Sequence, residues 1–208
     1  MHFGSSVEKV ETENIGDIFK EVAKNKNSYG ILPFENSIEG MVNQSLDNLI
    51  ESNLKICSEL ELPVEHSPIS SEKNINKLNT IYGHPQALAQ CRNWLSKNLP
   101  RAKIVETESS AKAAQLIKNK SGKGSIGPKQ ISEIYSLNLL KEKIQDQITN
   151  TTRFLVIGNE FPGKTSDDKT SISLSLKNEQ GALLKVLQIV NKNKICLLYT
   201  SPSPRDIG

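Results

Sequence analysis

Four short polar segments of the sequence carry amide, hydroxyl and imidazole groups that could bind a small polar ligand. They are Glu35-Asn36-Ser37, His84-Pro85-Gln86, Ser109-Ser110 and Thr151-Thr152-Arg153. The first three follow predicted strands, which is where α/β folds place ligand-binding groups. Neutral donors of this kind can hold a carboxylate or a hydroxyl, especially beside the free N–H groups at a helix start. The same residue types also serve as helix caps and turns, so their spacing alone leaves both interpretations open.

Alternating strand and helix patterns position these segments along the first three quarters of the chain. A helix capped by Asn14 is followed by a strand over 28–33 that we expect Pro33 to end, since proline cannot donate to a sheet. Further strands are predicted over 54–64, 80–82, 103–105, 125–127 and 153–157, with single helices between most of them. Their apolar stripes include Ile50, Ala113, Ala114, Ile117 and Ile134. Strands separated by single helices predict βαβ units and a largely parallel sheet.

The last quarter of the chain has a different pattern. Residues 159–169 contain Pro, Gly, Ser and two aspartates without periodicity, and they predict a linker. A strand over 172–176 and a helix over 183–190 should follow, but one strand and one helix cannot enclose a core. We therefore expect 170–195 to be part of a second domain, and the Pro-rich tail 196–208 to be foreign or disordered sequence.

Composition excludes several classes of protein. The 208 residues have a formal net charge of +3, too small and dispersed to predict nucleic acid or an anionic membrane as a partner. No run of about 18 apolar residues predicts a membrane span, and no secretory signal is visible. Three scattered cysteines form no Cys-x-x-Cys pair, which argues against a disulfide framework or a structural zinc site. These features predict a cytoplasmic protein.

Motifs for common cofactors and nucleophiles are also absent from the sequence. There is no Gly-x-Ser-x-Gly elbow, no P-loop, no Gly-x-Gly-x-x-Gly fingerprint and no His-Glu-x-x-His helix. An enzyme that depends on a nucleotide, a metal or a flavin is therefore disfavoured, and we expect no cofactor.

Six segments in order resemble the prephenate dehydratase family. They are GILPFENSIEG (30–40), YGHPQALAQC (82–91), ESSAKAA (108–114), SIGP (125–128), NTTRFLVIG (150–158) and KTSISLSLKNEQGALLKVL (169–187). The Asn150-Thr151-Thr152-Arg153-Phe154 element is the most specific of them. Each motif alone could arise by chance, but six in the family's order are strong evidence, and the match covers about residues 3–195.

The resemblance implies an α/β fold with two domains. Residues 1–158 would form a two-lobed catalytic domain like the type II periplasmic binding proteins, with the active site between its lobes. Residues 170–195 would be part of an α+β (ferredoxin-like) ACT domain that binds L-phenylalanine as a feedback inhibitor. The implied reaction converts prephenate to phenylpyruvate, water and carbon dioxide without a cofactor, in L-phenylalanine biosynthesis. Aromatisation drives it, so the site mainly has to assist departure of the ring hydroxyl and orient a dianion.

The family pattern also implies roles for individual residues. Thr152 would donate a hydrogen bond to the leaving hydroxyl, because a threonine is too weak an acid to transfer its proton outright. Four neutral residues would hold the substrate's carboxylates and keto group: Asn36, Ser37, Gln86 and Ser110. Arg153 would either anchor an anion or only brace its strand. In the ACT part, Gly181-Ala182-Leu183 would bind the effector's carboxylate through N–H groups at a helix start.

Two departures from the family pattern lead to further expectations. The family's first strand with its Gly-Pro-x-Gly-Thr loop does not precede Phe3, and the Glu-Ser-Arg-Pro element does not follow Ile195. We therefore expect weak activity or none from this chain, within a parent that forms homodimers or homotetramers. Two alternatives stay open. One is a non-catalytic module that senses an amino acid, and the other is a fragment of a bifunctional enzyme with chorismate mutase upstream.

Overall fold

The computed structural model describes residues 3–4, 6–165 and 168–197, and the chain divides into two compact units. The first unit contains the residues up to Glu35, Met41–Leu60 and the residues from Phe154 onward. The second contains Asn36–Gly40 and Glu61–Arg153. The unit boundaries fall within four strands, and each unit has its own core and sheet.

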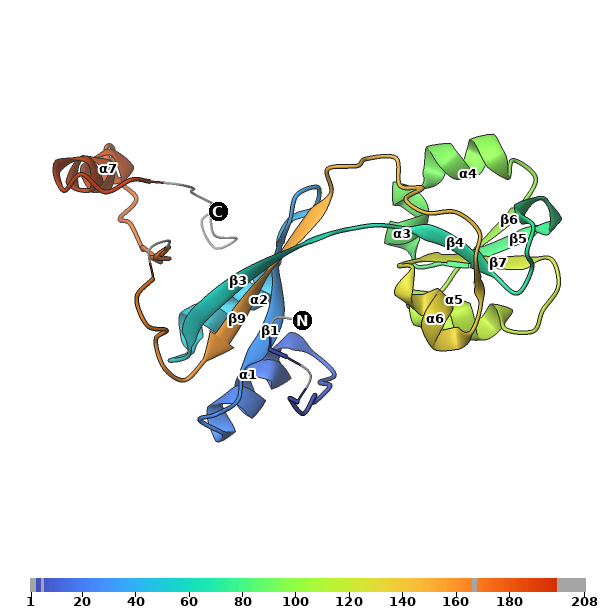
Figure 1. Cartoon of the computed structure of the whole chain (residues 1–208). Coiled ribbons are helices and arrows are strands. Elements are labelled where there is room, and N and C mark those ends of the chain that lie inside the picture. The colour runs from blue at the N-terminus through green and yellow to red at the C-terminus, as the bar shows by residue number, and fades with distance from the viewer. Residues whose placement is uncertain (1–2, 5, 166–167, 198–208) are drawn as a thin grey trace. The chain divides into compact units, whose positions relative to one another are not determined.

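The first unit is built on a four-stranded sheet with the order β2-β1-β9-β3 (Figure 1). The strands are β1 (Gly30–Asn36), β2 (Gly40–Met41), β3 (Lys55–Pro63) and β9 (Thr151–Gly158). Helices α1 (Ile15–Lys24) and α2 (Asn43–Glu51) belong to the same unit. Its core consists of Phe19, Val22, Leu32, Leu155 and Ile157. As the sequence predicts, Asn14 caps α1, and its side chain accepts the Asp17 N–H.

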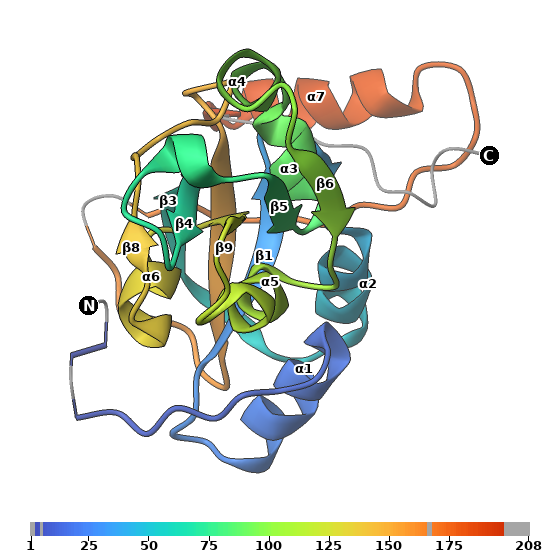
Figure 2. The same ribbon diagram turned by 90° about the vertical axis from the view of Figure 1, so that its right-hand side faces the viewer.

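The second unit is built on a five-stranded sheet with the order β6-β5-β7-β4-β8. The strands are β4 (Ser67–Ser70), β5 (Thr80–Gly83), β6 (Lys103–Glu106), β7 (Lys123–Gly127) and β8 (Asn138–Leu139). Strands β5 and β6 lie side by side and parallel (Figure 2), and β5 also pairs in parallel with β7. Strand β4 is antiparallel to both β7 and β8, so the sheet is mixed and the expectation of a largely parallel sheet is wrong.

Helices cover both faces of this mixed sheet (Figure 1). They are α3 (Pro85–Gln90), α4 (Arg92–Asn98), α5 (Ser110–Ile117) and α6 (Gln130–Tyr135), and a short 3₁₀ turn, η1, spans Ile75–Lys77. Leu88 of α3, Leu95 of α4 and Cys91 between the two helices pack with Ile81 and Ile126 of the sheet. On α5, the predicted inward residues Ala113, Ala114 and Ile117 are all fully buried.

Several local expectations are wrong for physical reasons. Strand β1 continues through Pro33 to Asn36, because β2 has only two residues and leaves most of β1 paired on one side. Ile50 and Ile134 are exposed, and the buried positions of their helices are Ser45 in α2 and Ile131 with Ser132 in α6. Of the cap and turn roles left open for segment 84–86, the structure shows the cap, since His84 precedes α3.

The C-terminal part contains the predicted helix but not the predicted strand. Helix α7 spans Ala182–Lys192, whereas residues 168–177 form no strand. A lone strand has no partner to complete its hydrogen bonds, and Ile172, Leu174 and Leu176 stay exposed. Of the predicted tail 196–208, residues 198–208 lie outside the described residues, as do Ser166 and Asp167 of the predicted linker. In the described ranges, no helix is long and apolar enough to cross a membrane.

Candidate functional site

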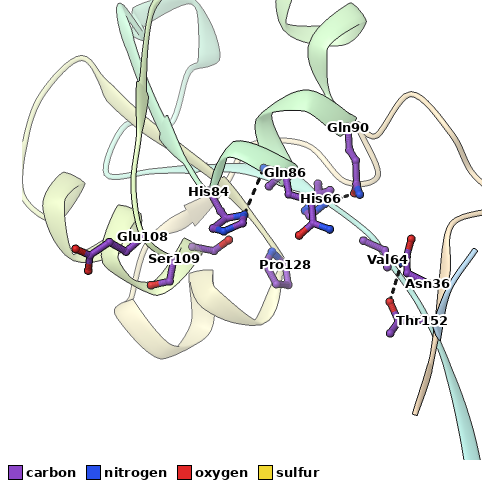
Figure 3. A pocket seen from close by; sticks show the side chains of 12 residues that line it. Asn36, Val64, His66, His84, Gln86, Gln90, Glu108, Ser109, Pro128 and Thr152 are labelled. Carbon is purple, nitrogen blue, oxygen red and sulfur yellow. Dashed lines mark hydrogen bonds between the residues drawn. The ribbon is translucent and has the colours of Figure 1, made fainter. Parts of the chain in front are cut away.

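A cavity of about 390 Å³ brings polar side chains of the second unit together (Figure 3). Its lining is mainly neutral and polar, and it comes from the ends of strands and the starts of helices. The lining residues are Asn36, Val64, His66, His84, Gln86, Ala87, Gln90, Glu108, Ser109, Ser110, Pro128 and Thr152. Four of the six predicted catalytic and substrate-binding residues are among them: Asn36, Gln86, Ser110 and Thr152.

Asn36 and Thr152 meet in this cavity although they are 116 residues apart in sequence. The Asn36 amide donates from Nδ2 to Thr152 Oγ1 over 3.0 Å, as the dashed line in Figure 3 marks. The threonine oxygen is therefore an acceptor in this bond. Its own hydrogen is left available for another acceptor.

The orientation of the Asn36 amide is fixed by the backbone. Its Oδ1 accepts the N–H groups of Ile38 at 3.0 Å and Glu39 at 3.1 Å. Backbone N–H groups can only donate, so the oxygen must face them and the nitrogen must face Thr152. The second hydrogen of Nδ2 is donated to Asn150 Oδ1 over 2.9 Å. Asn36 therefore uses both of its amide hydrogens inside the protein.

Ser37 does not line the cavity but connects the same two segments. Its Oγ lies 3.3 Å from both the Thr149 carbonyl oxygen and Asn150 Oδ1, and it accepts the Thr151 N–H at 3.0 Å. The Ser37 N–H donates to the Thr151 carbonyl at 2.9 Å. Ser37 is thus placed to hold the start of β9, where Thr152 lies.

Two helix starts supply the opposite wall of the cavity. His84 caps α3, and its Nδ1 accepts the Gln86 N–H at 3.3 Å. Ser109 caps α5, and its Oγ accepts the Lys112 N–H at 3.0 Å. His84 and Ser109 therefore act as helix caps, which is one of the two roles that the sequence left open. Both residues also line the cavity. Ser110 is the first residue of α5, directly after its cap.

The remaining predicted residues lie elsewhere. Arg153 is half-buried in β9 and does not line the cavity, since consecutive strand residues point to opposite faces. Gly181 precedes α7 with a φ of 82°, a left-handed conformation that glycine adopts without steric cost. Ala182 and Leu183 begin that helix, in the first unit.

Sequence reasoning missed three residues of the site: His66, Gln90 and Asn150. Gln90 follows Gln86 by four positions, a spacing that puts both on one face of a helix and could have revealed it. Asn150 lies in the segment quoted for the family resemblance and is only 2% exposed. His66 lies between two predicted strands and has no motif that would have singled it out.

The cavity has few charged groups. Within the described part of the chain its lining includes one carboxylate, that of Glu108, and no lysine or arginine. Cys91, next to Gln90, is fully buried, and burial together with nearby Asp146 raises the pKa of its thiol to about 12. A thiol with that pKa stays protonated and is a poor nucleophile. Among the described residues, no group of three His, Cys, Asp or Glu side chains could hold a metal ion.

Comparisons with known proteins agree on one family. The model of the family described as prephenate dehydratase matches residues 1–162. The chain is 40% identical over 202 residues to a bifunctional chorismate mutase/prephenate dehydratase of Aquifex aeolicus, covering 97% of this chain and 56% of that protein. It is 38% identical over 203 residues to a prephenate dehydratase of Methanocaldococcus jannaschii, covering 94% and 72%.

A solved structure supports the same assignment. The prephenate dehydratase of Arthrobacter aurescens, in complex with L-Phe, matches with a TM-score of 0.77 and 27% identity. The match covers 88% of this chain and 63% of that one. The chain thus has an α/β fold similar to that structure, and it spans little more than half the length of the bifunctional relative.

Proposed function

Because the chain belongs to the prephenate dehydratase family, we propose that it converts prephenate to phenylpyruvate, water and carbon dioxide. In this reaction the ring C–O bond breaks, and the departing hydroxyl becomes water by taking a proton from solvent. The bond from the ring to its carboxylate breaks as well, and its electron pair completes the aromatic ring. The observation that carries the proposal is the Asn36–Thr152 hydrogen bond at the wall of a cavity of about 390 Å³.

Thr152 is the proposed catalytic residue. Its oxygen accepts a hydrogen from Asn36, so its own hydrogen can be directed at the leaving hydroxyl. A hydroxyl that accepts one hydrogen bond becomes a stronger donor in the next. A positioned donor of this kind stabilises the negative charge that develops on the departing oxygen, without a full transfer of the threonine proton.

The substrate's carboxylates and keto group are proposed to bind neutral donors on the other walls. Gln86, Gln90 and Ser110 supply amide and hydroxyl hydrogens. Because Ser109 caps the Lys112 N–H, the N–H groups of Ser110 and Ala111 at the start of α5 are the ones that can receive an anion. Asn36 and Ser37 were expected to share this binding role. Their hydrogen bonds within the protein instead support a role in holding Thr152.

Two substitutions at Thr152 test the proposal. Thr152→Val keeps the side-chain volume and removes the hydroxyl, and we expect kcat to fall by about 100- to 1,000-fold, as for the loss of one transition-state donor. Thr152→Ser keeps the hydroxyl and should retain most of the activity. Phenylpyruvate formation measures kcat, and calorimetric titration with prephenate measures binding. Turnover by Thr152→Val equal to that of the unsubstituted chain would contradict the proposal.

We also propose that the two units correspond to the two lobes of a type II periplasmic-binding-protein-like domain over residues 1–158, in a cytoplasmic protein. Support comes from the path of the chain. Asn36–Gly40 and Glu61–Arg153 form the second unit, and the segments before, between and after them form the first. The parent protein is proposed to assemble as a homodimer or homotetramer. The similarity to bifunctional relatives supports an origin in such an enzyme.

Regulation by L-phenylalanine is the last part of the proposal. The Arthrobacter aurescens relative has L-Phe bound, and residues 170–195 would be part of an ACT domain joined by the linker 159–169. Gly181 provides no side-chain cap for α7. The Ala182 N–H donates to the Glu179 carbonyl at 3.2 Å, so the next N–H groups of the helix are the ones that can receive an amino acid's carboxylate. Calorimetry with L-phenylalanine tests this. Binding of L-phenylalanine without turnover of prephenate would favour the amino-acid-sensing alternative.

A further inference from the structure

A buried imidazole lies against one of the amides of the cavity. His66 Nε2 is 2.9 Å from Gln90 Oε1, and both residues line the cavity (Figure 3). His66 is only 8% exposed, whereas Gln90 is half-buried. The His66 ring is therefore largely covered, and Gln90 is the more exposed residue of the two.

One short segment holds both residues in place. The His66 N–H donates to Gln145 Oε1 at 3.1 Å, and the His66 carbonyl accepts the Ile144 N–H at 2.9 Å. The Asp146 N–H donates to the Gln90 carbonyl at 2.7 Å. The backbones of His66 and Gln90 are thus tied to three consecutive residues, which fixes the distance between their side chains.

The location of the imidazole proton decides which end of the Gln90 amide faces the cavity. Burial lowers the pKa of His66, so the ring is neutral near pH 7 and carries one N–H. Its Nδ1 is buried and has no hydrogen-bond partner within the described residues. A buried N–H without a partner is rarer in proteins than an unpaired acceptor, so the proton belongs on Nε2. The Nε2–H then donates to Gln90 Oε1, and the Gln90 NH₂ group is the end left for a ligand.

We infer that His66 is a positioning residue, which holds Gln90 so that its amide hydrogens face a carboxylate or carbonyl oxygen of the bound substrate. This inference rests on the proposed function for the identity of the substrate. The contact between His66 and Gln90 does not depend on it. Without His66, the Gln90 amide could turn its oxygen toward the substrate's oxygen, and binding would weaken.

A double-mutant cycle tests whether His66 acts through Gln90. His66→Phe keeps a flat ring without the donor, and Gln90→Met keeps the length of the side chain without the amide. We expect each single variant to raise KM for prephenate about tenfold with little change in kcat, about 1.4 kcal/mol of binding. In the double variant, His66→Phe should add no further increase, because the amide it orients is gone. Independent effects that multiply to about 100-fold would overturn the inference.

Nitrogen-15 NMR of the ligand-free chain provides a readout that does not require activity. Above the ordinary imidazole pKa, we expect the His66 ring to be the Nε2–H tautomer. A proton on Nδ1 would overturn the inference even in an active protein. Failure of the proposed function appears differently, as absence of prephenate binding by the unsubstituted chain.

Discussion

Two hydrogen-bonded pairs, Asn36–Thr152 and His66–Gln90, line the same cavity but are held in different ways. The orientation of the first pair is set by two backbone N–H groups that Asn36 Oδ1 accepts. The orientation of the second pair depends on which nitrogen of His66 carries a proton. Backbone N–H groups thus orient the amide of Asn36, whereas a titratable ring orients the amide of Gln90.

This difference matters for the proposed chemistry. A group that donates to the leaving hydroxyl has to point in one direction at every pH at which the enzyme works, and a bond network without titratable groups achieves this. A group that only binds the substrate can depend on a neutral histidine as long as the pH stays above the pKa of that ring. We therefore expect substitutions in the two pairs to separate into effects on kcat and effects on KM.

The largest expected effect in this comparison comes from Asn36→Ala. The substitution removes the donor to Thr152 Oγ1, so the threonine hydroxyl can rotate away from the substrate. We expect kcat to fall about 100-fold with a smaller change in KM, measured by phenylpyruvate formation. Asn76→Ala, at an exposed asparagine in η1, is the matched control and should leave both constants unchanged. If Asn36→Ala changed only KM, the two pairs would not differ in the kinetic constant that they affect.

Asn150→Ala should have a smaller effect that includes stability. Asn150 Oδ1 accepts from Asn36 Nδ2, and the residue is almost completely buried. Its loss leaves the second hydrogen of the Asn36 amide with only a long contact, to the Thr151 carbonyl oxygen at 3.4 Å. We expect a decrease of about 1–3 kcal/mol in the free energy of unfolding, measured in urea. We also expect kcat to fall about tenfold, since the backbone bonds to Asn36 Oδ1 remain. A normal kcat in the destabilised variant would show that Asn150 supports the fold without orienting Thr152.

Local features of the fold were predictable from the sequence because they depend on near neighbours. The cap at Asn14 and the buried face of α5 follow from residue types three and four positions apart. Strand β4 was not predictable, because its four residues are Ser-Pro-Ile-Ser and its burial comes from tertiary contacts. It pairs with β7 and β8, and Ile69 packs against Ala114 and Ile131. The strand expected over 172–176 failed for the opposite reason, since its alternation has no partner strand.

The site was predictable only in part. The family resemblance, and not periodicity, placed Asn36 and Thr152 together across 116 residues. The resemblance could not reveal that the amide hydrogens of Asn36 are used within the protein. That depends on where Ile38 and Glu39 hold the amide oxygen and where Asn150 accepts from the nitrogen. His66 was missed because its importance comes from burial beside Gln90, and a lone histidine in a sequence carries no such information.

The smallest expected effect is the pH dependence of stability, and it should distinguish the two pairs. Burial lowers the pKa of His66 below its ordinary 6.5, so between these two values the unfolded chain binds more protons than the folded one. The free energy of unfolding should therefore fall as pH drops through this window and should be unaffected by His66 above it. Urea unfolding at a series of pH values measures this for the unsubstituted chain, His66→Phe and Asn36→Ala.

The His66→Phe variant should lose this decrease, whereas Asn36→Ala should keep it, since its pair contains no titratable group. The acidic groups Asp17, Glu72 and Asp168, whose pKa values are lowered from 3.8, 4.5 and 3.8, affect stability only at lower pH and are common to all three proteins. His84 and Glu108, which also line the cavity, are present in all three proteins as well. If His66→Phe kept the same decrease, the ring would not be the group that titrates, and the contrast between a backbone-fixed pair and a proton-dependent pair would not hold.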